Sequence, residues 1–509
     1  MTHTGTLGWF ARHELRLAWR DWIWLLSGGR HRRARRALFG FAIFALFMHG
    51  FAFTMVARYA EIGVEADKTT LIVITGSALL SWSVMLSQAI ESVTRAFYAR
   101  ADLDLILSSP VAARRLFSVR IAAMALSIAV MAALLAAPFI DVLALRGGGR
   151  WLAAYGVVVA MGLTAGAVAV ALTVALFRLI GPKRTRLVAQ IVAAVIGAAF
   201  VIGLQIAAIM SYGTLSRVAI LQSDWVVERA PDAGSMLWWP ARAMIGDTGA
   251  LAVLLAVSFV LLGAAILVFS PRFAQHAAAA AAVSQVPVRR SGRARRFRRT
   301  TPMRALRRKE WLLLRRDPWL VSQTLMQLLY LVPPAVLLWR SFGEASDAPM
   351  LLVPVLVMAA GQLAGGLAWL AISGEDAPDL VATAPVSAKR VLRAKIEALT
   401  GVIALVFAPL LAALALAAPD AALAAAPTIA LAAASATAIQ LAFRSQARRS
   451  HFRRRQTSSR IATFAEAFSS IGWAATGALA ALGSWLALVT GLLAAATVMA
   501  ARKLAPSHS

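Results

Sequence analysis

Two stretches of the chain repeat the same charged and turn-forming residues in the same order, and these residues are suited to binding a partner. In each stretch an Asp-Leu pair is followed six residues later by Pro-Val, and two basic residues come shortly after. The side chains selected are Asp102, Asp104, Pro110, Val111, Arg114 and Arg115 in the first stretch, and Asp379, Pro385, Val386, Lys389 and Arg390 in the second. Carboxylates and basic groups at fixed spacing make charge-assisted hydrogen bonds to a partner. The pattern therefore predicts a docking element and not a catalytic centre.

The local chemistry of this stretch favours a helix, a break and a second helix. Ser109 is a good helix cap, and Pro110 is favoured in the first turn of a helix. Arg114 and Arg115 would then lie one turn inside that helix. For a single copy, an interfacial re-entry whose Arg residues only hold the topology would be the better interpretation. The recurrence of the element at a matched position favours docking.

Catalytic signatures are absent from the sequence. No G-x-x-x-x-G-K-[ST] phosphate loop occurs, and Lys183 follows a Gly-Pro pair without the required loop length or Ser/Thr. There is no G-x-S-x-G or H-E-x-x-H motif, and the seven His residues are not paired at metal-binding spacing. The chain is therefore predicted not to be an enzyme and to bind no cofactor or metal itself.

The apolar content of the chain requires a membrane. Hydrophobic residues make up 60% of the 509 residues, whereas soluble domains average nearly half. Long apolar runs recur along the chain and do not alternate with period two, which favours membrane-spanning helices over a barrel. With no cysteine, the chain has no disulfide framework. The sequence thus predicts an all-α integral membrane protein.

Twelve runs approach the roughly 20 residues that cross a bilayer. They are residues 37–57, 70–90, 119–140, 151–177, 187–210, 250–269, 321–340, 350–372, 396–418, 427–443, 461–482 and 484–501, the last two being separated near Gly483. An even number of spans places both termini on one side. Residues 1–36 contain no cleavable signal sequence, so the first span is expected to direct insertion.

The distribution of charge supports this topology and places the termini in the cytoplasm. Basic residues in membrane proteins concentrate in cytoplasmic loops. The segments predicted to be cytoplasmic hold 44 of the 52 basic residues, which accounts for the net charge of +29. These segments are 1–36, 95–120, 178–186, 272–316, 374–395, 444–460 and 502–503. The Arg-rich linker 276–303 could also be a nucleic-acid signal, but a solvated cytoplasmic loop is favoured, and no nucleic-acid partner is expected.

A second element precedes the first span of each half. Residues 9–26 form an amphipathic pattern, with an aromatic face and an Arg face, that is typical of a helix at the membrane surface. Arg-His-Glu before Arg-Asp in the first half matches Arg-Lys-Glu before Arg-Asp in the second, 296 residues later. The residues selected are Glu14, Arg20 and Asp21, with Glu310, Arg316 and Asp317 as their copies. A lipid-surface anchor alone would also explain the first of these helices.

Two matches in the same order indicate an internal duplication. The Pro-Val element recurs at an offset of 275 residues, so the second copy is shorter between the two elements. With six spans in each half, the repeats are parallel and related by an axis along the membrane normal. We therefore predict a first module of residues 1–275, the linker 276–303 and a second module of residues 304–509. Only the first module has a long polar segment, 211–249, before its last span.

These elements resemble those of the permeases of type-2 ABC transporters, the exporter-type family with six spans per module. The residues that carry the resemblance are Arg12 to Asp21, Asp102 to Arg115, Arg308 to Asp317 and Asp376 to Arg390. The resemblance implies connecting helices before the first span of each half and coupling helices at 102–118 and 376–395. It also implies that 211–249 is an extracytoplasmic re-entrant segment with Trp225, Trp238 and Trp239 at the outer interface. The second half departs from the family in lacking this segment.

The resemblance implies the transmembrane subunit of an ATP-driven transporter, an exporter, in the inner membrane of a bacterium. Two copies of a separate cytoplasmic ATPase would bind ATP and Mg²⁺ and dock on the coupling helices, and membrane lipid would surround the spans. An ion-coupled secondary carrier is an alternative, although the acidic residues in the spans lie near predicted span ends, which disfavours ion coupling. They are Glu91, Asp141, Glu397 and Glu466. A non-transporting scaffold or regulator is a further alternative.

Overall fold

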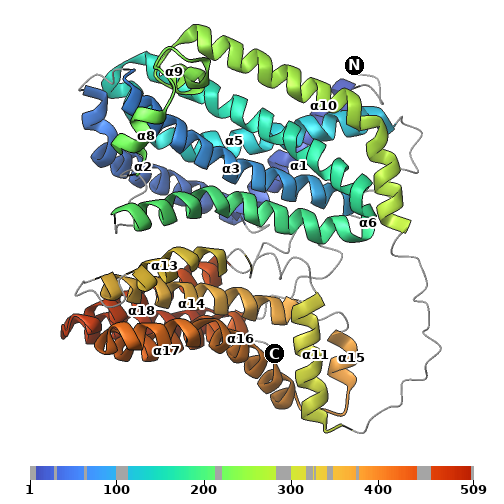
Figure 1. Cartoon of the computed structure of the whole chain (residues 1–509). Coiled ribbons are helices and arrows are strands. Elements are labelled where there is room, and N and C mark those ends of the chain that lie inside the picture. Colours follow the sequence, from blue (N-terminus) through green and yellow to red (C-terminus); the bar gives the residue numbers. More distant parts are fainter. Residues whose placement is uncertain are drawn as a thin grey trace. The chain divides into compact units, whose positions relative to one another are not determined.

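The computed structural model describes residues 7–27, 31–61, 66–98, 113–212, 220–282, 300–316, 325, 328–340, 348–373, 378–443 and 460–505. Within these ranges the ordered elements are helices, and no strand occurs (Figure 1). Contacts divide the chain into two compact units, Met1–Leu204 with Ser216–Val288, and Gln205–Leu215 with Arg289–Ser509. The prediction of an all-helical chain is confirmed for the described residues.

The first unit is built from long helices joined by short connections. Its long helices are α1 (Leu7–Ser27), α2 (His31–Glu61), α3 (Lys68–Tyr98), α5 (Ala113–Gly147), α6 (Ala153–Tyr212, whose last residues belong to the second unit) and α10 (Thr248–Ala282). Its short helices are η1 (Gly149–Leu152), α8 (Asp224–Arg229), η2 (Met236–Trp238) and α9 (Trp239–Met244). Helix α5 contacts α1, α2, α3 and α10, so it is central to this unit.

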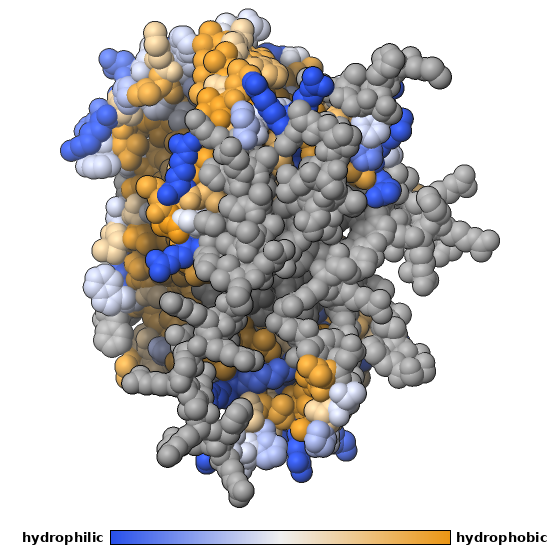
Figure 2. Space-filling model, turned by 90° about the vertical axis from the view of Figure 1, so that its right-hand side faces the viewer, coloured by the Kyte–Doolittle hydropathy of each residue, from blue (hydrophilic) through white to orange (hydrophobic). Residues whose placement is uncertain are grey.

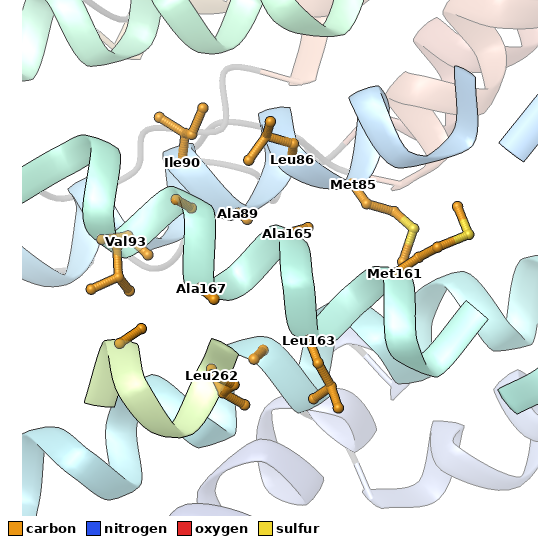
Figure 3. Packing of buried hydrophobic residues seen from close by; sticks show 14 of the residues in the cluster. Met85, Leu86, Ala89, Ile90, Val93, Met161, Leu163, Ala165, Ala167 and Leu262 are labelled. Carbon is orange, nitrogen blue, oxygen red and sulfur yellow. The ribbon is translucent and has the colours of Figure 1, made fainter. Parts of the chain in front are cut away.

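Small residues let the helices of the first unit approach closely. Figure 3 shows Ala165 and Ala167 of α6 among larger residues of α3 and α10, with Met85 and Met161 pointing toward each other. Gly162 and Gly166 of α6 lie directly against α5, because a Cβ at either position would meet an alanine there. Helices in lipid associate by such close packing because the hydrophobic effect does not drive them together.

Helix α6 is two helices joined at a break. Gly181 has φ 72° and ψ 167°, a conformation that glycine adopts without the penalty other residues incur. The break separates two apolar helices long enough to cross a membrane, Gly149–Gly181 and Arg184–Ser211. This agrees with the separate spans predicted at 151–177 and 187–210.

The second unit has a closely packed bundle and a smaller group of helices at one end. The bundle contains α13 (Val332–Arg340), α14 (Ala348–Ser373), α16 (Ala388–Ala417), α17 (Pro419–Phe443), α18 (Arg460–Ala481) and α19 (Leu486–Leu504). Helices α11 (Pro302–Arg316) and α15 (Pro378–Thr383) lie at the end where α16 begins (Figure 1). Inside the bundle, the Trp473 indole N–H of α18 donates to Ser435 Oγ of α17 at 2.8 Å.

The last two helices are joined by the predicted tight turn. Gly483 has φ 67°, and the Ser484 amide donates to the Leu479 carbonyl at 2.8 Å. This left-handed glycine with a six-to-one hydrogen bond is the usual end of a helix. The turn therefore separates α18 from α19 at the predicted glycine.

Nine helices in the described part of the chain are long and apolar enough to cross a membrane. They do not include three of the predicted spans. Ala45–Ala57 of α2 and Leu328–Arg340 are shorter apolar segments, and α18 is 22 residues long but contains Glu466, Ser469 and Ser470. A multi-pass membrane protein is thus supported, whereas the number twelve stays a prediction.

The exposed surface of these helices is strongly apolar. Leu145, Leu405 and Leu416 are 83%, 72% and 76% exposed. On the face shown in Figure 2, hydrophobic residues lie next to one another at the surface, with hydrophilic side chains among them. Water-soluble monomers rarely expose apolar patches of this extent. Such a surface requires lipid around the helices.

The contact between α5 and α6 gives a prediction for stability. Gly162→Ala is expected to destabilise the protein by about 1–3 kcal/mol, because its methyl group would overlap Ala129 and force the helices apart. Gly263→Ala in α10 is the matched control, since no atom lies within 4 Å of the added Cβ. Thermal unfolding in detergent measures both. Equal stability of the two variants would show that the α5–α6 approach is not tight.

Candidate functional site

The second predicted docking stretch forms a short helix, a bend and the start of a long helix. Residues 384–387 form the bend between α15 and α16, and the Val386 amide donates to the Ala384 carbonyl at 2.7 Å. This bond spans two residues and closes a tight turn. Pro385 is exposed within the bend and does not open the helix, which begins three residues later at Ala388. The bend therefore projects between two helices at one end of the second unit.

The two basic pairs occupy equivalent places in the two units. Arg114 and Arg115 are the second and third residues of α5, and Lys389 and Arg390 are the second and third residues of α16. All four side chains are exposed, and none forms an ion pair within the described part of the chain. The N-terminus of a helix favours anions, so the pairs do not stabilise their own helices. They present positive charge that an acidic surface could bind.

Helix α11 is fixed to the bundle by a buried ion pair. The side chain of Glu310 is 3% exposed, and Lys395 Nζ of α16 lies 3.2 Å from both of its carboxylate oxygens. Lys395 Nζ also donates to the carbonyl of Ala371, near the end of α14, at 2.6 Å. A second lysine, Lys309, lies 3.3 Å from Glu310. One ammonium group thus links α11, α14 and α16 next to the bend.

A second ionic group lies on the exposed side of the same contact. Arg307 Nε donates to Glu397 Oε2 at 2.6 Å, and Arg393 Nε donates to Glu397 Oε1 at 2.9 Å. The hydrogen bond to Glu397 raises the pKa of Arg307 above its ordinary value. Exposed pairs of this kind add little stability individually. Of the two pairs, only Arg307 with Glu397 joins α11 to α16, because Arg393 and Glu397 both belong to α16.

An aromatic contact completes the attachment of α11. A Cβ at Gly401 of α16 would come within 3.1 Å of the Trp311 ring, so the ring lies directly over the helix backbone. Figure 1 shows α11 crossing the end of the unit, where α15 also lies. The bend and α11 are therefore both carried by the first turns of α16.

The first unit pairs its own amphipathic helix with the corresponding long helix. Helix α1 contacts α5 and α2. Leu15 and Trp19 are 60% and 66% exposed, consistent with an apolar face in contact with lipid. Glu14 is half-buried, whereas Arg20 is exposed. The contact of α1 with α5 parallels that of α11 with α16.

Several predicted site residues are not located in detail. Asp102, Asp104, Pro110, Val111 and Asp317 lie outside the described residues. Asp21, Arg316 and Asp379 lie in α1, α11 and α15, but their side chains fall outside the described part. The structure thus brings together Pro385, Val386, Lys389, Arg390 and Glu310 at one end of the second unit, and places Arg114 and Arg115 at the start of α5.

Lys395 and Arg307 were not identified from the sequence, and Glu397 was noted only as an acidic residue near a span end. One signal could have found the first of them. Lys395 follows Pro385 by ten residues, and Arg120 follows Pro110 by the same ten residues. A basic residue at this position in both halves can be recognised as the partner of an acidic residue only once the burial of Glu310 is known.

The segment before α10 packs on α3. Trp238 is 6% exposed, and its indole N–H lies 3.2 Å from the Pro231 carbonyl and 3.0 Å from the Asp232 carbonyl. It therefore anchors the segment internally. Trp225 is 62% exposed, with the Arg229 guanidinium 4.6 Å above its ring, and Trp239 is half-buried. Of the three tryptophans expected at the outer interface, Trp225 is thus the most exposed, and the place of the segment in the membrane stays a prediction.

A polar network in the first unit was also not predicted from the sequence. The Tyr155 hydroxyl donates to Asp141 Oδ1 at 2.7 Å, and His49 Nε2 lies 3.2 Å from Asp141 Oδ2. The network joins α2, α5 and α6 and satisfies the carboxylate of Asp141 within the helices. No cluster of three or more His or acidic side chains able to hold a metal occurs among the described residues.

Comparisons with protein-family models, with curated proteins and with solved structures give no match to this chain.

Proposed function

We propose that the chain is the transmembrane subunit of an ATP-driven transporter of the ABC type, an exporter, in a bacterial inner membrane. The observation that carries the proposal is the group at the start of α16, where an exposed bend and a basic pair adjoin an amphipathic helix fixed by a buried ion pair. A buried charge pair contributes little net stability, so its main effect is to fix the geometry of the helices that it joins. A fixed, exposed basic surface is what a docking partner needs.

The partner in this proposal is a separate cytoplasmic ATPase, two copies of it, one for each half of the chain. The ATPase would hold ATP and Mg²⁺, so the chain itself would not be an enzyme. Closure of the ATPase pair would push on both predicted docking stretches. In the second unit, Lys395 would pass this movement to α11 and to the end of α14, because its ammonium group contacts both.

The proposal includes two parallel six-span repeats with both termini in the cytoplasm. Two correspondences support it: the basic pairs hold the same positions in α5 and α16, and α1 contacts α5 as α11 contacts α16. In this alignment of the two halves, Glu14 corresponds to Glu310 and Arg120 corresponds to Lys395. We infer that these two residues form the corresponding link in the first half.

The absence of cysteine allows a direct test of the topology. Ser387→Cys, in the exposed bend, is expected to react with a membrane-impermeant thiol reagent only after the membrane is opened. Met236→Cys, whose native side chain is 72% exposed, is expected to react in intact cells. The native chain is the silent control. Labelling of both variants from the same side would contradict the proposed arrangement of spans.

Photocrosslinking tests the docking proposal. A photoreactive amino acid at Ser387 is expected to capture a protein that contains a phosphate-binding loop, identified by mass spectrometry. The same residue at Met236 is the control and is expected to capture no ATPase. Crosslinks from position 387 to lipid or to the chain itself would favour the interfacial turn that only holds topology.

An ion-coupled carrier is the second candidate, because one carboxyl, that of Glu466, lies against the neighbouring helix backbone in the second unit. Carriers driven by ions usually keep such groups inside the membrane. The two functions differ in their energy source. Vanadate-sensitive ATP hydrolysis by the purified protein and its partner would favour the transporter proposal, and a permease without an ATPase would favour the carrier or a scaffold.

A further inference from the structure

Two polar side chains of α18 face two glycines of α14 inside the second unit. A Cβ at Gly365 would meet the carboxylate of Glu466, and a Cβ at Gly361 would meet the hydroxyl of Ser470. The glycines are one helical turn apart, and so are their polar neighbours, in the opposite chain direction. We call this antiparallel contact the α14–α18 seam. It brings a carboxyl group against a helix backbone with no side chain between them.

The carboxyl has one hydrogen-bond partner in the described part of the chain. Gln440 of α17, which is 4% exposed, donates from Nε2 to Glu466 Oε2 at 2.5 Å. A neutral amide cannot balance the charge of a carboxylate. Among the described residues Glu466 takes part in no ion pair.

The helices packed against α18 provide little compensating charge. Helix α14 contains no titratable residue, and α17 contains only Asp420, 20 residues from Gln440 and so about 30 Å along the helix. Arg502 and Lys503 of α19 are exposed in its last turn. Arg460 opens α18, about 9 Å along the axis before Glu466. Within the part of the chain that the structure describes, the seam therefore holds no cation; the basic loop 444–459, which joins α17 to α18, lies outside that part.

Glu466 is half-buried. An ionised carboxylate that is largely removed from water without a cation is unfavourable, and such groups take up a proton instead. We propose that Glu466 is a proton-binding site in the α14–α18 seam, occupied while the two helices are in contact. The Gln440 amide binds Oε2, so the proton resides on Oε1. When the helices part and water enters, the O–H bond breaks and the proton passes to water.

Two buried hydroxyls form an independent part of the evidence for a polar site. Ser469 and Ser470 are each 1% exposed, and neither hydroxyl has a hydrogen-bond partner among the described residues. Unpaired buried hydroxyls cost free energy and are uncommon in a purely structural seam. Ser470 faces the same two helices as Glu466, one turn further along α18. Its hydroxyl is a second polar group in the seam, able to form a hydrogen bond with a protonated carboxyl or with a water molecule.

The position of the site links it to the group at the start of α16. Helix α14 ends near Ala371, whose carbonyl is held by Lys395. A displacement of this end would move α14 along α18 and open the seam. The proton site itself does not rest on the proposed function, because it depends only on contacts inside the second unit.

Infrared spectroscopy of the purified chain tests the proposal. At neutral pH the protein is expected to show the C=O band of a protonated carboxylic acid, and Glu466→Gln is expected to remove that band. Glu91→Gln is the matched control, since Glu91 pairs with Arg95 at 3.1 Å and should lose only carboxylate bands. If the Glu466 variant does not fold, chain labelled with ¹³C-glutamate gives the answer directly. Glutamates that are all ionised at neutral pH would overturn the proposal.

A second variant tests whether the seam holds the proton. Gly365→Ala must displace the carboxyl and is expected to reduce the carboxylic acid band at neutral pH, whereas Gly263→Ala should leave it unchanged. An unchanged band in Gly365→Ala would overturn the role of the seam. If sodium removes the band and a large organic cation does not, the site binds a metal cation in place of a proton. That result would overturn the assignment.

Discussion

Reversal of both basic pairs is expected to abolish association with the ATPase while leaving the chain folded and inserted. The variant carries Arg114→Glu, Arg115→Glu, Lys389→Glu and Arg390→Glu. All four side chains are exposed and unpaired within the described part of the chain, so no internal contact is lost. Like charges brought together at an interface cost several kcal/mol, and each 1.4 kcal/mol weakens binding about tenfold. Co-purification of the ATPase with the tagged chain measures the effect.

The control for this prediction reverses one basic pair elsewhere in the chain, with the same change in charge as the reversal of either docking pair. Arg502→Glu with Lys503→Glu alters two exposed basic residues at the end of α19, on the side predicted to be cytoplasmic. This control is expected to retain the ATPase. Reversal of one pair alone is expected to weaken association without abolishing it. Full retention of the ATPase by the fourfold variant would show that the basic pairs are topological signals and not a docking surface.

Glu310→Ala is expected to lower the free energy of unfolding of the second unit by about 3–5 kcal/mol. The change leaves the ammonium group of Lys395, which is 13% exposed, without its carboxylate. An unpaired buried charge is far more costly than the pair is stabilising. Unfolding in detergent with a chemical denaturant measures the loss.

Two further variants separate the charge from the packing. Glu310→Leu with Lys395→Leu removes both charges and is expected to recover most of the lost stability, because a buried pair can be replaced by apolar residues at little cost. Arg307→Ala breaks an exposed pair and should have a much smaller effect. Equal losses in the single and double variants would mean that Glu310 acts through shape and not through charge.

The helices were predictable where local sequence decides the structure. Gly181 and Gly483 break helices because each adopts a positive φ, and both breaks lie where the apolar runs were separated. Long apolar runs also located most of the helices. The predicted span at 461–482 coincides with α18, but α18 is not among the helices apolar enough to cross a membrane, because some of its residues are polar and contact α14 and α17. A hydropathy pattern cannot distinguish polar residues that face a neighbouring helix from those of a surface helix.

The candidate site was predictable only in part, for a related reason. The basic pairs were found because they are local, exposed and repeated. The pairing of Glu310 with Lys395 joins residues 85 positions apart, and nothing in either local sequence specifies that contact. It arises from the way α11 lies across the start of α16, which depends on Trp311 fitting over Gly401. Tertiary packing, and not composition, determines which of many charges become buried.

The measurement that tests the central claim most directly is affinity purification of the tagged chain from its native membrane in mild detergent. We expect a second protein with a phosphate-binding loop, present at about two copies per chain, and ATP hydrolysis that vanadate inhibits. A chain that is purified alone, intact and without such hydrolysis would contradict the proposed function and favour an ion-coupled carrier or a scaffold.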